Sequence, residues 1–559
     1  MDKRFFLALL LTGVVLVVTP LIFTPQRPVA VSGPSIAPQV DNTAPAAGAT
    51  PQDPEQRSAS VLPRTNESFR GQAMSAVPTR VAADTVGLDA PNARYEFSSL
   101  GATPLSVTVL GHRSFALGAE GEPAILHNGE EPLLRFDVIT SRDTLRLDRV
   151  EFRSVLEQRG DARGVVFTSA DPAIPATIEY RTTPTPFLSR MRVSVPGMPG
   201  RSFLVIGLPG GFTSQEADTL DDIRHLSYSA KPVGRSAKGV SFSSLDPGER
   251  QLVAGGLSWA VAKSKYFAMG VLSTSDSTPF AELQVTGGRR DTKLATRAIG
   301  NVVIPMIDGA AEFDLYAGPQ SWEGMRALGR EFETANPYGG FMQPIVQPFA
   351  TIVMRTMLWM KRVIRLDYGW VLVIFGVAIR LVLWPLNQSA MRASIRLQRI
   401  QPELQAVQAQ HKSDRTKQQQ EMMRVYQEHG MSPFSALSGC LPALIPMPVF
   451  FALFFVFQNT IEFRGVPFLW LADISLRDPL YILPVVTGAS MFLLSWIGMR
   501  NMPKNPQATM MLYLMPGMFT VFLLSTASGL SIYYLVQQIA AIPQQWMIAN
   551  ERRKATPKK

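Results

Sequence analysis

Two kinds of hydrophobic pattern divide the chain. Between about residues 61 and 333, short runs alternate apolar and polar side chains, as in Met191-Arg-Val-Ser-Val195, and Gly, Pro and Asp turns separate the runs. Such alternation is typical of antiparallel strands with one buried face. Residues 61–335 are therefore predicted to form a large all-β sandwich domain. Because this segment is long for one sandwich, we expect extra strands or a small helix near residues 322–333.

Long apolar stretches take over after the β-rich region. A helix that crosses about 30 Å of hydrocarbon needs about 20 apolar residues. Stretches of suitable length lie at residues 5–23, 368–386, 434–461 and 480–499, and the uncharged run 505–550 is long enough for two more, with Ser528-Gly529 as the turn between them. The pattern predicts six transmembrane helices, of which the last five form a bundle within residues 367–550.

The first apolar stretch differs from a cleaved signal peptide. Lys3 and Arg4 precede it, but no small-x-small cleavage site follows closely, since Pro28-Val29-Ala30 fits poorly. Residues 1–23 are predicted to be an uncleaved membrane anchor, with a signal peptide as the alternative. Residues 24–60 are rich in Pro, Ala, Ser, Gln and Thr, a composition that cannot bury enough apolar surface to order itself, and they are predicted to be a disordered tether.

Two further helical segments are predicted not to cross the membrane. Residues 341–366 are apolar on one face and basic on the other, which favours an amphipathic helix in the membrane interface over a continuation into the next span. Residues 389–430 keep a helical spacing of apolar positions on both sides of a break at 411–414. They are predicted to form a helical hairpin.

The net charge of +10 fits a membrane protein better than a protein that binds nucleic acid, because the basic residues gather at the ends of apolar segments. Six crossings that begin in the cytoplasm place residues 387–433, 500–507 and the basic tail 551–559 in the cytoplasm, and all three segments carry an excess of Lys and Arg. The charges predict cytoplasmic N- and C-termini. The β domain then lies on the opposite side, which is the periplasm in a cell with two membranes.

Motifs for metal, nucleotide or hydrolytic chemistry are absent from the sequence. Cys440 is the only cysteine, so no intramolecular disulfide can form, and the five histidines are scattered. There is no GxxxxGK[ST] phosphate loop and no GxSxG elbow. We expect no enzymatic activity, no cofactor and no bound metal.

Arg380 is the main candidate functional residue. It lies near the middle of an apolar stretch, with no other charge for about two turns on either side. A central arginine costs about 2.5–3.5 kcal/mol on insertion scales, so it should face a wet cavity or a partner and not lipid. No acidic residue lies in the bundle spans to pair with it. This favours a wet functional cavity, here called the candidate groove, over a structural arginine that snorkels or is paired locally.

Polar and methionine side chains extend this candidate groove. The polar candidates are Gln458, Asn459, Thr520, Tyr533, Tyr534 and Gln537. Hydroxyl side chains in membrane helices more often bond backbone carbonyls, and tyrosines can anchor at the interface. Methionine is concentrated in the last 219 residues, with 17 of the 24 in the chain, and a flexible apolar surface suits varied partners. The candidates for a slide that guides apolar substrate helices are Met447, Phe450, Met491, Met515 and Met518, with ordinary gap filling as the alternative at each.

Four strings in this region resemble the YidC/Oxa/Alb insertase family. They are Gly369-Trp-Val-Leu-Val-Ile-Phe-Gly-Val-Ala-Ile-Arg380 followed by Pro385-Leu-Asn387, Gly439-Cys-Leu-Pro-Ala-Leu-Ile-Pro-Met-Pro-Val-Phe450, Asp478-Pro-Leu-Tyr-Ile-Leu-Pro484, and Ser528-Gly-Leu-Ser-Ile-Tyr-Tyr534. The anchor, tether and β domain ahead of them resemble the Gram-negative members, so the resemblance covers nearly the whole chain. It implies a five-helix core around a hydrophilic groove open to the cytoplasm and to lipid, and a periplasmic super-β-sandwich.

The resemblance also implies roles for single residues. Arg380 would supply the positive charge of the groove, and Tyr533 and Tyr534 would lie on the helix where substrates make contact. Two departures affect this expectation. Pro446 stands where many members carry glutamine, and Gly376, one turn before Arg380, replaces a polar residue of some members.

Together these features favour a membrane protein insertase and chaperone of the inner membrane, acting alone or with the Sec translocon. The expected partners are nascent membrane proteins, the Sec translocon, membrane lipids, and the ribosome through the cytoplasmic hairpin and basic tail, with no direct reading of nucleic acid. The alternative is a secondary transporter that binds an anionic solute through Arg380, but we find no internal repeat and no paired broken helices in the sequence. A periplasmic binding or scaffold protein is a third possibility.

Overall fold

The computed structural model describes residues 84–555 except for Glu130, Arg142 and the segments 276–277, 291–293, 337–342, 412–413, 431–446 and 500–505. The predicted anchor and tether therefore lie outside the described residues, as do residues 61–83 of the β domain. The same holds for Cys440 and Pro446, and for the end of the basic tail from residue 556.

The β-rich part begins with a small antiparallel sheet. Its strands run in the order β1-β2-β3-β4, and their bounds are β1 (Thr85–Ala90), β2 (Ala93–Ser98), β3 (Thr103–Arg113) and β4 (Pro123–His127). Tyr95 and Phe97 on β2 are fully buried, and their rings stack with centroids 5.7 Å apart. Phe97 also contacts Phe167 of the second sheet, with ring centroids 5.7 Å apart. The two sheets thus share one apolar core, as a sandwich requires.

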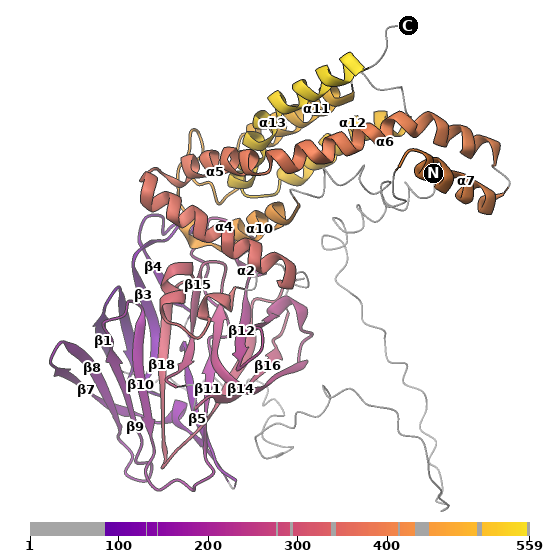
Figure 1. Ribbon diagram of the computed structural model, residues 1–559. Helices are drawn as coiled ribbons and strands as arrows, with labels where there is room; N and C mark the ends of the chain where they lie inside the picture. The colour runs from indigo at the N-terminus through magenta and orange to yellow at the C-terminus, as the bar shows by residue number, and fades with distance from the viewer. Residues whose placement is uncertain are drawn as a thin grey trace, which may run out of the picture. The chain divides into compact units, whose positions relative to one another are not determined.

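The second sheet is much larger, with 14 strands in antiparallel pairs (Figure 1). Its main path is β6-β5-β11-β17-β16-β14-β15-β18-β10-β9-β8-β7, and β12 and β13 branch from β14. The strand bounds are β5 (Arg135–Ile139), β6 (Thr144–Arg146), β7 (Phe152–Arg159), β8 (Ala162–Ser169), β9 (Thr177–Thr182), β10 (Leu188–Ser194), β11 (Phe203–Leu208), β12 (Ser227–Pro232), β13 (Lys238–Ser241), β14 (Arg250–Lys263), β15 (Phe267–Ser273), β16 (Phe280–Gly287), β17 (Ala298–Pro305) and β18 (Ala310–Pro319).

Alternation along the strands sets the register of this sheet. On β10 the side chains of Met191 and Val193 are fully buried, while Arg190 and Arg192 between them are exposed. Met191 is paired with Tyr180 of β9 and Phe313 of β18, so three buried side chains meet on one face. A shift by one residue would turn this apolar set toward water. The prediction of a large antiparallel β domain is confirmed.

Short helices decorate the sandwich. They are α2 (Thr219–Arg224), α3 (Trp322–Ala327) and the 3-10 turns at Leu147–Arg149, Phe242–Ser244 and Phe332–Ala335. Ser321 caps α3, because its side-chain oxygen accepts a hydrogen bond from the Gly324 amide. The small helix expected near residues 322–333 is confirmed.

Helices make up the rest of the described chain (Figure 1). They are α4 (Gln343–Ile364), α5 (Tyr368–Val382), α6 (Trp384–Gln410), α7 (Arg415–Glu428), α10 (Met447–Asn459), α11 (Ile482–Met499), α12 (Pro506–Leu523) and α13 (Ser528–Ala555). α4 agrees with the predicted amphipathic segment, and α6 and α7 form the predicted hairpin. α12 and α13 are separate helices, as the Ser528-Gly529 signal indicated.

One boundary differs from the prediction. The apolar stretch expected to run as one span over residues 368–386 ends as helix α5 at Val382, and α6 begins at Trp384. Pro385 lies in the first turn of α6, where its missing N–H costs nothing, but within a continuous helix it would remove a hydrogen bond. The predicted hairpin of residues 389–430 therefore starts earlier, at the end of α5.

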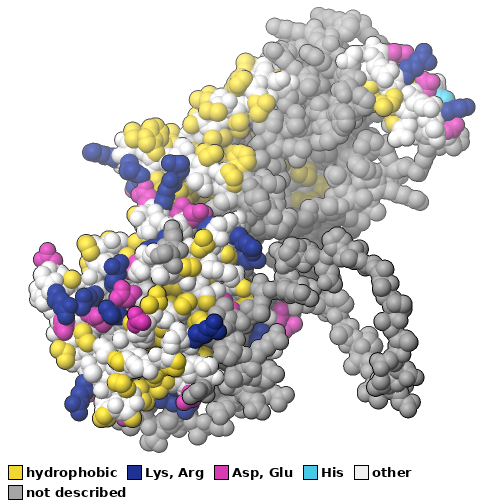
Figure 2. Space-filling model, turned by 60° about the horizontal axis from the view of Figure 1, so that its bottom comes forward, with side chains coloured by type: hydrophobic (Ala, Val, Ile, Leu, Met, Phe, Trp, Pro, Cys, Tyr) yellow, Lys and Arg dark blue, Asp and Glu magenta, His cyan; other side chains and the backbone are white. Residues whose placement is uncertain are grey.

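The six-helix count is not confirmed. Among the described residues, Ile482–Met499 alone is long and apolar enough to cross a membrane, and only 22% of it is buried. Three shorter apolar helices, Tyr368–Val382, Val449–Gln458 and Leu512–Leu523, accompany it. Figure 2 shows hydrophobic side chains gathered on part of the helical surface, and hydrophobic and charged side chains mixed on the sandwich.

Candidate functional site

Arg380 lies in the last turn of α5, where the helix packs against α13. Its Nη2 donates a hydrogen bond of 2.9 Å to Oε1 of Gln544. The Nε atom is buried and has no hydrogen-bond partner, and no ion pair involves this guanidinium within the described parts of the chain. Because a guanidinium carries five N–H donors, a neutral amide leaves most of them available.

Arg380 lines a cavity of about 190 Å³. It is lined by Arg380, Asn387, Leu494, Tyr533, Tyr534, Gln537, Gln538, Ala541, Gln544, Gln545 and Ile548. Four of these side chains are glutamines and one is asparagine, so the lining offers neutral donors and acceptors around a single positive charge. The arrangement can hold water or a polar segment beside Arg380.

Helix α13 supplies most of the lining because one face of the helix points into the cavity. Tyr533, Gln537, Ala541, Gln544 and Ile548 follow each other at intervals of three or four residues, which places them on one side of a helix. Gln537 links this face to α5, because its Nε2 donates a hydrogen bond of 2.8 Å to the Gly376 carbonyl. The same Nε2 donates a hydrogen bond of 3.3 Å to the Tyr533 hydroxyl on α13.

Gly376 allows the close approach of α5 and α13. A Cβ at this position would lie 3.0 Å from Cγ1 of Val536 and 3.6 Å from Cδ2 of Tyr533. A larger polar side chain at Gly376 would therefore have to displace Val536. The backbone carbonyl of Gly376 instead provides the polar contact to Gln537.

The predicted groove residues do not all meet at this cavity. Arg380, Tyr533, Tyr534 and Gln537 line it, whereas Gln458 and Thr520 do not. The Thr520 hydroxyl donates a hydrogen bond of 2.8 Å to the Pro516 carbonyl of its own helix. This is the bond to a backbone carbonyl that hydroxyl side chains in membrane helices often make. Asn459 ends α10, and its side chain lies outside the described residues.

The predicted slide residues are distributed over three helices. Met515 on α12 is exposed, Met518 on α12 and Met491 on α11 are half-buried, and the side chain of Met447 on α10 lies outside the described residues. Phe450 is buried inside an aromatic cluster with Phe451, Phe454, Phe519, Phe522 and Tyr534, so it does not present an open apolar surface.

Gln544 and Asn387 are two of the cavity residues that sequence analysis missed. Gln544 bonds Arg380 directly, and Asn387 is buried in the first turn of α6. The spacing from Tyr533 and Gln537 to Gln544 on one helix face was a signal that could have identified Gln544. Asn387 gave no such signal, because the break between α5 and α6 was not predicted.

The site has no feature of a metal centre. Among the residues that the structure describes, no group of three His, Cys, Asp or Glu side chains could hold a metal ion. The chemistry of the cavity is that of one cation, several amides and two phenol groups.

Comparisons with known proteins agree with this architecture. Residues 359–555 match the family model described as 60Kd inner membrane protein, and residues 215–352 match the model described as YidC periplasmic domain. A relative from Anaeromyxobacter dehalogenans (strain 2CP-C), named membrane protein insertase YidC, is 31% identical over 409 residues, which cover 71% of each chain. A second insertase of that name, from Anaeromyxobacter sp. (strain Fw109-5), is 33% identical over 323 residues, or 56% of each chain.

A solved structure titled as an active YidC insertase with its first transmembrane domain resolved covers 82% of this chain and 92% of its own, with 16% identity and a TM-score of 0.33. The sequence relatives support the insertase interpretation over the transporter alternative, and the two family models describe an inner membrane protein with a periplasmic domain. The chain therefore belongs to the 60Kd inner membrane protein family, among the membrane protein insertases named YidC.

Proposed function

We propose that this chain moves nascent membrane proteins into the inner membrane, and that the cavity around Arg380 holds a polar segment of the substrate during transfer. The observation that carries the proposal is the guanidinium itself. It has one neutral side-chain partner, Gln544, and lines a cavity rich in amide groups.

The physical problem is the cost of moving polar groups through hydrocarbon. Each unsatisfied polar group costs several kcal/mol there, and a charge costs more. The amide side chains of Gln537, Gln538, Gln544 and Gln545 can replace water for such a segment, and Arg380 adds attraction for a carboxylate. A hydrophilic tail would enter from the cytoplasm, rest beside Arg380 and be released on the opposite side.

An apolar substrate helix needs a different path, along the exposed faces of the helices. Exposed apolar side chains on α11 and α12 include Leu493, Trp496, Met510, Tyr513, Met515 and Val521. Met515 and Met518 of α12 and Met491 of α11 would guide varied apolar segments into lipid, because methionine adapts to many shapes. Gln458, Thr520 and Phe450 then have structural roles, while Asn459 stays a candidate for the groove and Met447 a candidate for the slide.

Transfer needs no nucleotide in this scheme. Burial of the apolar substrate helix in lipid is favourable, and a membrane potential supplies about 2.3 kcal/mol per charge per 100 mV. In the proposed topology both termini and the α6–α7 hairpin lie in the cytoplasm, six helices cross the membrane, and the β domain lies in the periplasm. The excess of Lys and Arg in the three cytoplasmic segments supports this orientation.

The same topology suggests partners. The basic hairpin and tail would dock the ribosome, the helices would contact membrane lipids, and the chain would work alone or as a chaperone beside the Sec translocon. The hairpin is held by its own small core of Ile400, Leu404 and Val425, so it presents a firm surface to such a partner.

The proposal is tested by replacing Arg380 and measuring insertion of single-span substrates with acidic or neutral tails. Arg380→Ala should reduce insertion of the acidic-tail substrate by about tenfold or more, since a charge-assisted hydrogen bond contributes about 1.5–3 kcal/mol. Arg380→Lys should retain more activity, because it keeps the charge but loses the planar set of donors. The neutral-tail substrate should lose less.

Arg355 provides a matched control, because it is an exposed arginine on α4 outside the cavity. Arg355→Ala should leave both substrates inserted at the rate of the unmodified protein. Equal insertion of the acidic tail by Arg380→Ala and by the unmodified protein would rule out the attraction of charge. Uptake of an anionic solute by the purified protein in liposomes would instead support transport.

A further inference from the structure

The loop of residues 460–481 between α10 and α11, here called the cap loop, closes one end of the helical bundle. Its backbone folds on itself through the Ile474 amide, which donates 3.0 Å to the Val466 carbonyl. It holds α13 through the amides of Ser528 and Gly529, which donate to Leu476 and Ile474 at 2.7 and 2.9 Å. Asp478 accepts hydrogen bonds from the Leu480 and Leu483 amides and thus caps α11.

Aromatic contacts fix the cap loop to two more helices. Phe463 packs on Phe457 of α10 and Tyr368 of α5, with ring centroids 4.6 and 5.1 Å apart. Phe468 packs on Trp370 of α5 at 5.3 Å. The cap loop thus joins α5, α10, α11 and α13 at one end, and a shift of the loop would affect all four helices.

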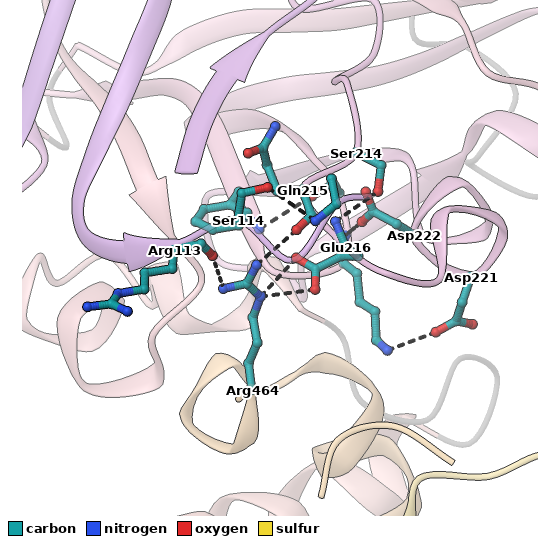
Figure 3. Close-up of polar contacts among 12 residues, drawn as sticks. Arg113, Ser114, Ser214, Gln215, Glu216, Asp221, Asp222 and Arg464 are labelled. Carbon is teal, nitrogen blue, oxygen red and sulfur yellow. Dashed lines mark hydrogen bonds and ion pairs between the residues drawn. The ribbon is translucent and has the colours of Figure 1, made fainter. Parts of the chain in front are cut away.

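Arg464 of the cap loop is inserted into the β domain. Its Nε donates hydrogen bonds of 2.9 and 3.0 Å to the two carboxylate oxygens of Glu216 (Figure 3). Its Nη1 donates a hydrogen bond of 2.7 Å to the Arg113 carbonyl, and its Nη2 donates one of 3.1 Å to the Gln215 carbonyl. Only 4% of the Arg464 side chain and 7% of the Glu216 side chain are exposed. A buried charge pair of this kind requires full hydrogen bonding, and here three separate groups provide it.

Aromatic rings complete the socket around this guanidinium. Phe115, Phe267 and Tyr266 lie with ring centroids 4.4, 5.4 and 5.8 Å from its central carbon. The next residue, Gly465, has a φ of +70°, and a Cβ there would lie 2.6 Å from Cζ of Phe115. The sequence Arg464-Gly465 is therefore matched to the socket, since the glycine lets the chain turn directly above Phe115.

A second attachment lies two residues earlier. Oε1 of Glu462 accepts hydrogen bonds from the Trp322 amide at 2.9 Å and from the Ser321 hydroxyl at 3.2 Å. The cap loop also buries one side chain in the core of the β domain, and the β domain buries one in the core of the helices. Ile461 belongs to the apolar core of the β domain, and Trp322 belongs to the apolar core of the helices.

The cap loop and the Arg380 cavity lie at opposite ends of the same helices. The cap loop contacts the first residues of α5 and α13, while Arg380 and Gln544 lie near the other end of the contact between these helices. With a rise of 1.5 Å per residue, Gly369 and Arg380 are separated by about 16 Å along α5.

We propose that Arg464 and Glu462 form a two-point anchor through which the β domain holds the cap loop in place over the end of the bundle opposite the Arg380 cavity. In this arrangement contacts with the β domain stabilise the end of the helical bundle. Release of the anchor loosens the cap loop and the helix ends that it joins.

The anchor is tested by hydrogen exchange on the full chain in detergent, without substrate. Glu216→Ala changes only the β domain, yet it should speed exchange of the amides of Phe468, Ile474 and Gly529 by on the order of tenfold or more, because the cap loop opens more often. Arg464→Ala should have at least as large an effect, since it also removes the hydrogen bonds to the Arg113 and Gln215 carbonyls. The double variant should add little to the change in Arg464→Ala, because the ion pair is already lost there.

Milder variants and a control keep the result interpretable if a variant does not fold. Arg464→Lys and Glu216→Gln should give smaller increases, in the same amides. Arg192 of the exposed Arg192–Glu312 pair provides the control, and Arg192→Ala should leave the cap loop unchanged.

If Glu216→Ala and Glu216→Gln speed exchange only in the β domain, or if Arg192→Ala has the same effect on the cap loop, the anchor does not exist. An insertion assay on Arg380 variants is independent of this result. Failure of the anchor and failure of the proposed function can therefore be told apart.

Discussion

At the scale of single residues, Glu462 is a buried acid whose charge costs stability. Burial, and to a smaller extent the nearby carboxylate of Glu323, which is paired with Arg362, together raise its pKa from the ordinary 4.5 to about 7. The hydrogen bonds from Ser321 and Trp322 act in the opposite direction but are weaker than the burial. The folded chain therefore holds a proton on Glu462 at pH values where the unfolded chain does not.

The sign of the resulting pH dependence follows from linkage. Between about pH 4.5 and 7 the folded state binds more protons than the unfolded state, so the free energy of unfolding falls as the pH rises through this window and then levels off. With 1.36 kcal/mol per pKa unit, the loss from this group is about 3 kcal/mol. Glu462→Gln keeps the acceptor for Ser321 and Trp322 without the charge, so it should raise Tm at pH 8 and change it little at pH 5.

Thermal unfolding in detergent from pH 5 to 8 measures this effect. Burial also raises the pKa of Glu216, whose contribution has the same sign, so the difference between Glu462→Gln and the unmodified protein isolates Glu462. Glu312→Gln, at an exposed carboxylate, is the control and should not change the pH profile. Parallel profiles for Glu462→Gln and the unmodified protein would exclude a titration of Glu462 in this range.

At the scale of helices, α11 and α12 pack through a glycine. A Cβ at Gly488 would lie far inside van der Waals contact with the Thr520 hydroxyl oxygen, and 3.2 Å from the Thr520 Cβ. Thr520 is thus a packing residue as well as a polar one. Gly488→Ala should destabilise the protein by about 1–3 kcal/mol, as overpacking does.

The Thr520 side chain offers a direct test of this contact. Thr520→Ala removes the hydroxyl that a Cβ at position 488 would meet, so Gly488→Ala/Thr520→Ala should recover most of the Tm lost in Gly488→Ala. Insertion by Thr520→Ala alone should stay close to that of the unmodified protein. A double variant as unstable as Gly488→Ala would mean that the Thr520 hydroxyl does not cause the overpacking. Poor insertion by Thr520→Ala would point to a role of the hydroxyl in the groove.

Local sequence patterns predicted the helices and strands well, but they predicted poorly where helices end and which residues contact each other. Alternation along the strands identified the β domain, and the isolated charge of Arg380 in an apolar stretch identified a residue of the cavity. The break after Val382 was missed because the stretch is apolar on both sides, and only Pro385 marks the restart of a helix. Apolar periodicity does not distinguish one long span from two helices that meet at a proline.

Arg464 shows a deeper limit of sequence analysis. In the sequence it is one basic residue in a short turn, which is usually a solvated position. Its partner Glu216 is 248 residues away, and the two carbonyls that accept its other hydrogen bonds belong to different strands and loops of the β domain. No local periodicity relates such positions, so the anchor becomes visible only after the chain has folded.

At the scale of the whole molecule, the proposed topology places the β domain and the α6–α7 hairpin on opposite sides of the membrane. Cys440 is the only cysteine, so Cys440→Ser provides a background without thiols. In that background Val155→Cys on β7 and Gln419→Cys on α7 introduce one thiol each at exposed positions. A membrane-impermeant maleimide added to intact spheroplasts should label the first cysteine and not the second.

Opening the spheroplasts should then label Gln419→Cys to the same extent as Val155→Cys, which shows that the α7 site is accessible once the membrane is no barrier. Labelling of both before opening would mean that the hairpin is outside or that the membrane leaks, and a cytoplasmic protein thiol distinguishes these cases. If the cytoplasmic thiol stays unlabelled, labelling of Gln419→Cys in intact spheroplasts would place the hairpin outside and overturn the proposed orientation. The Arg380 cavity would then have to receive substrates from the other side.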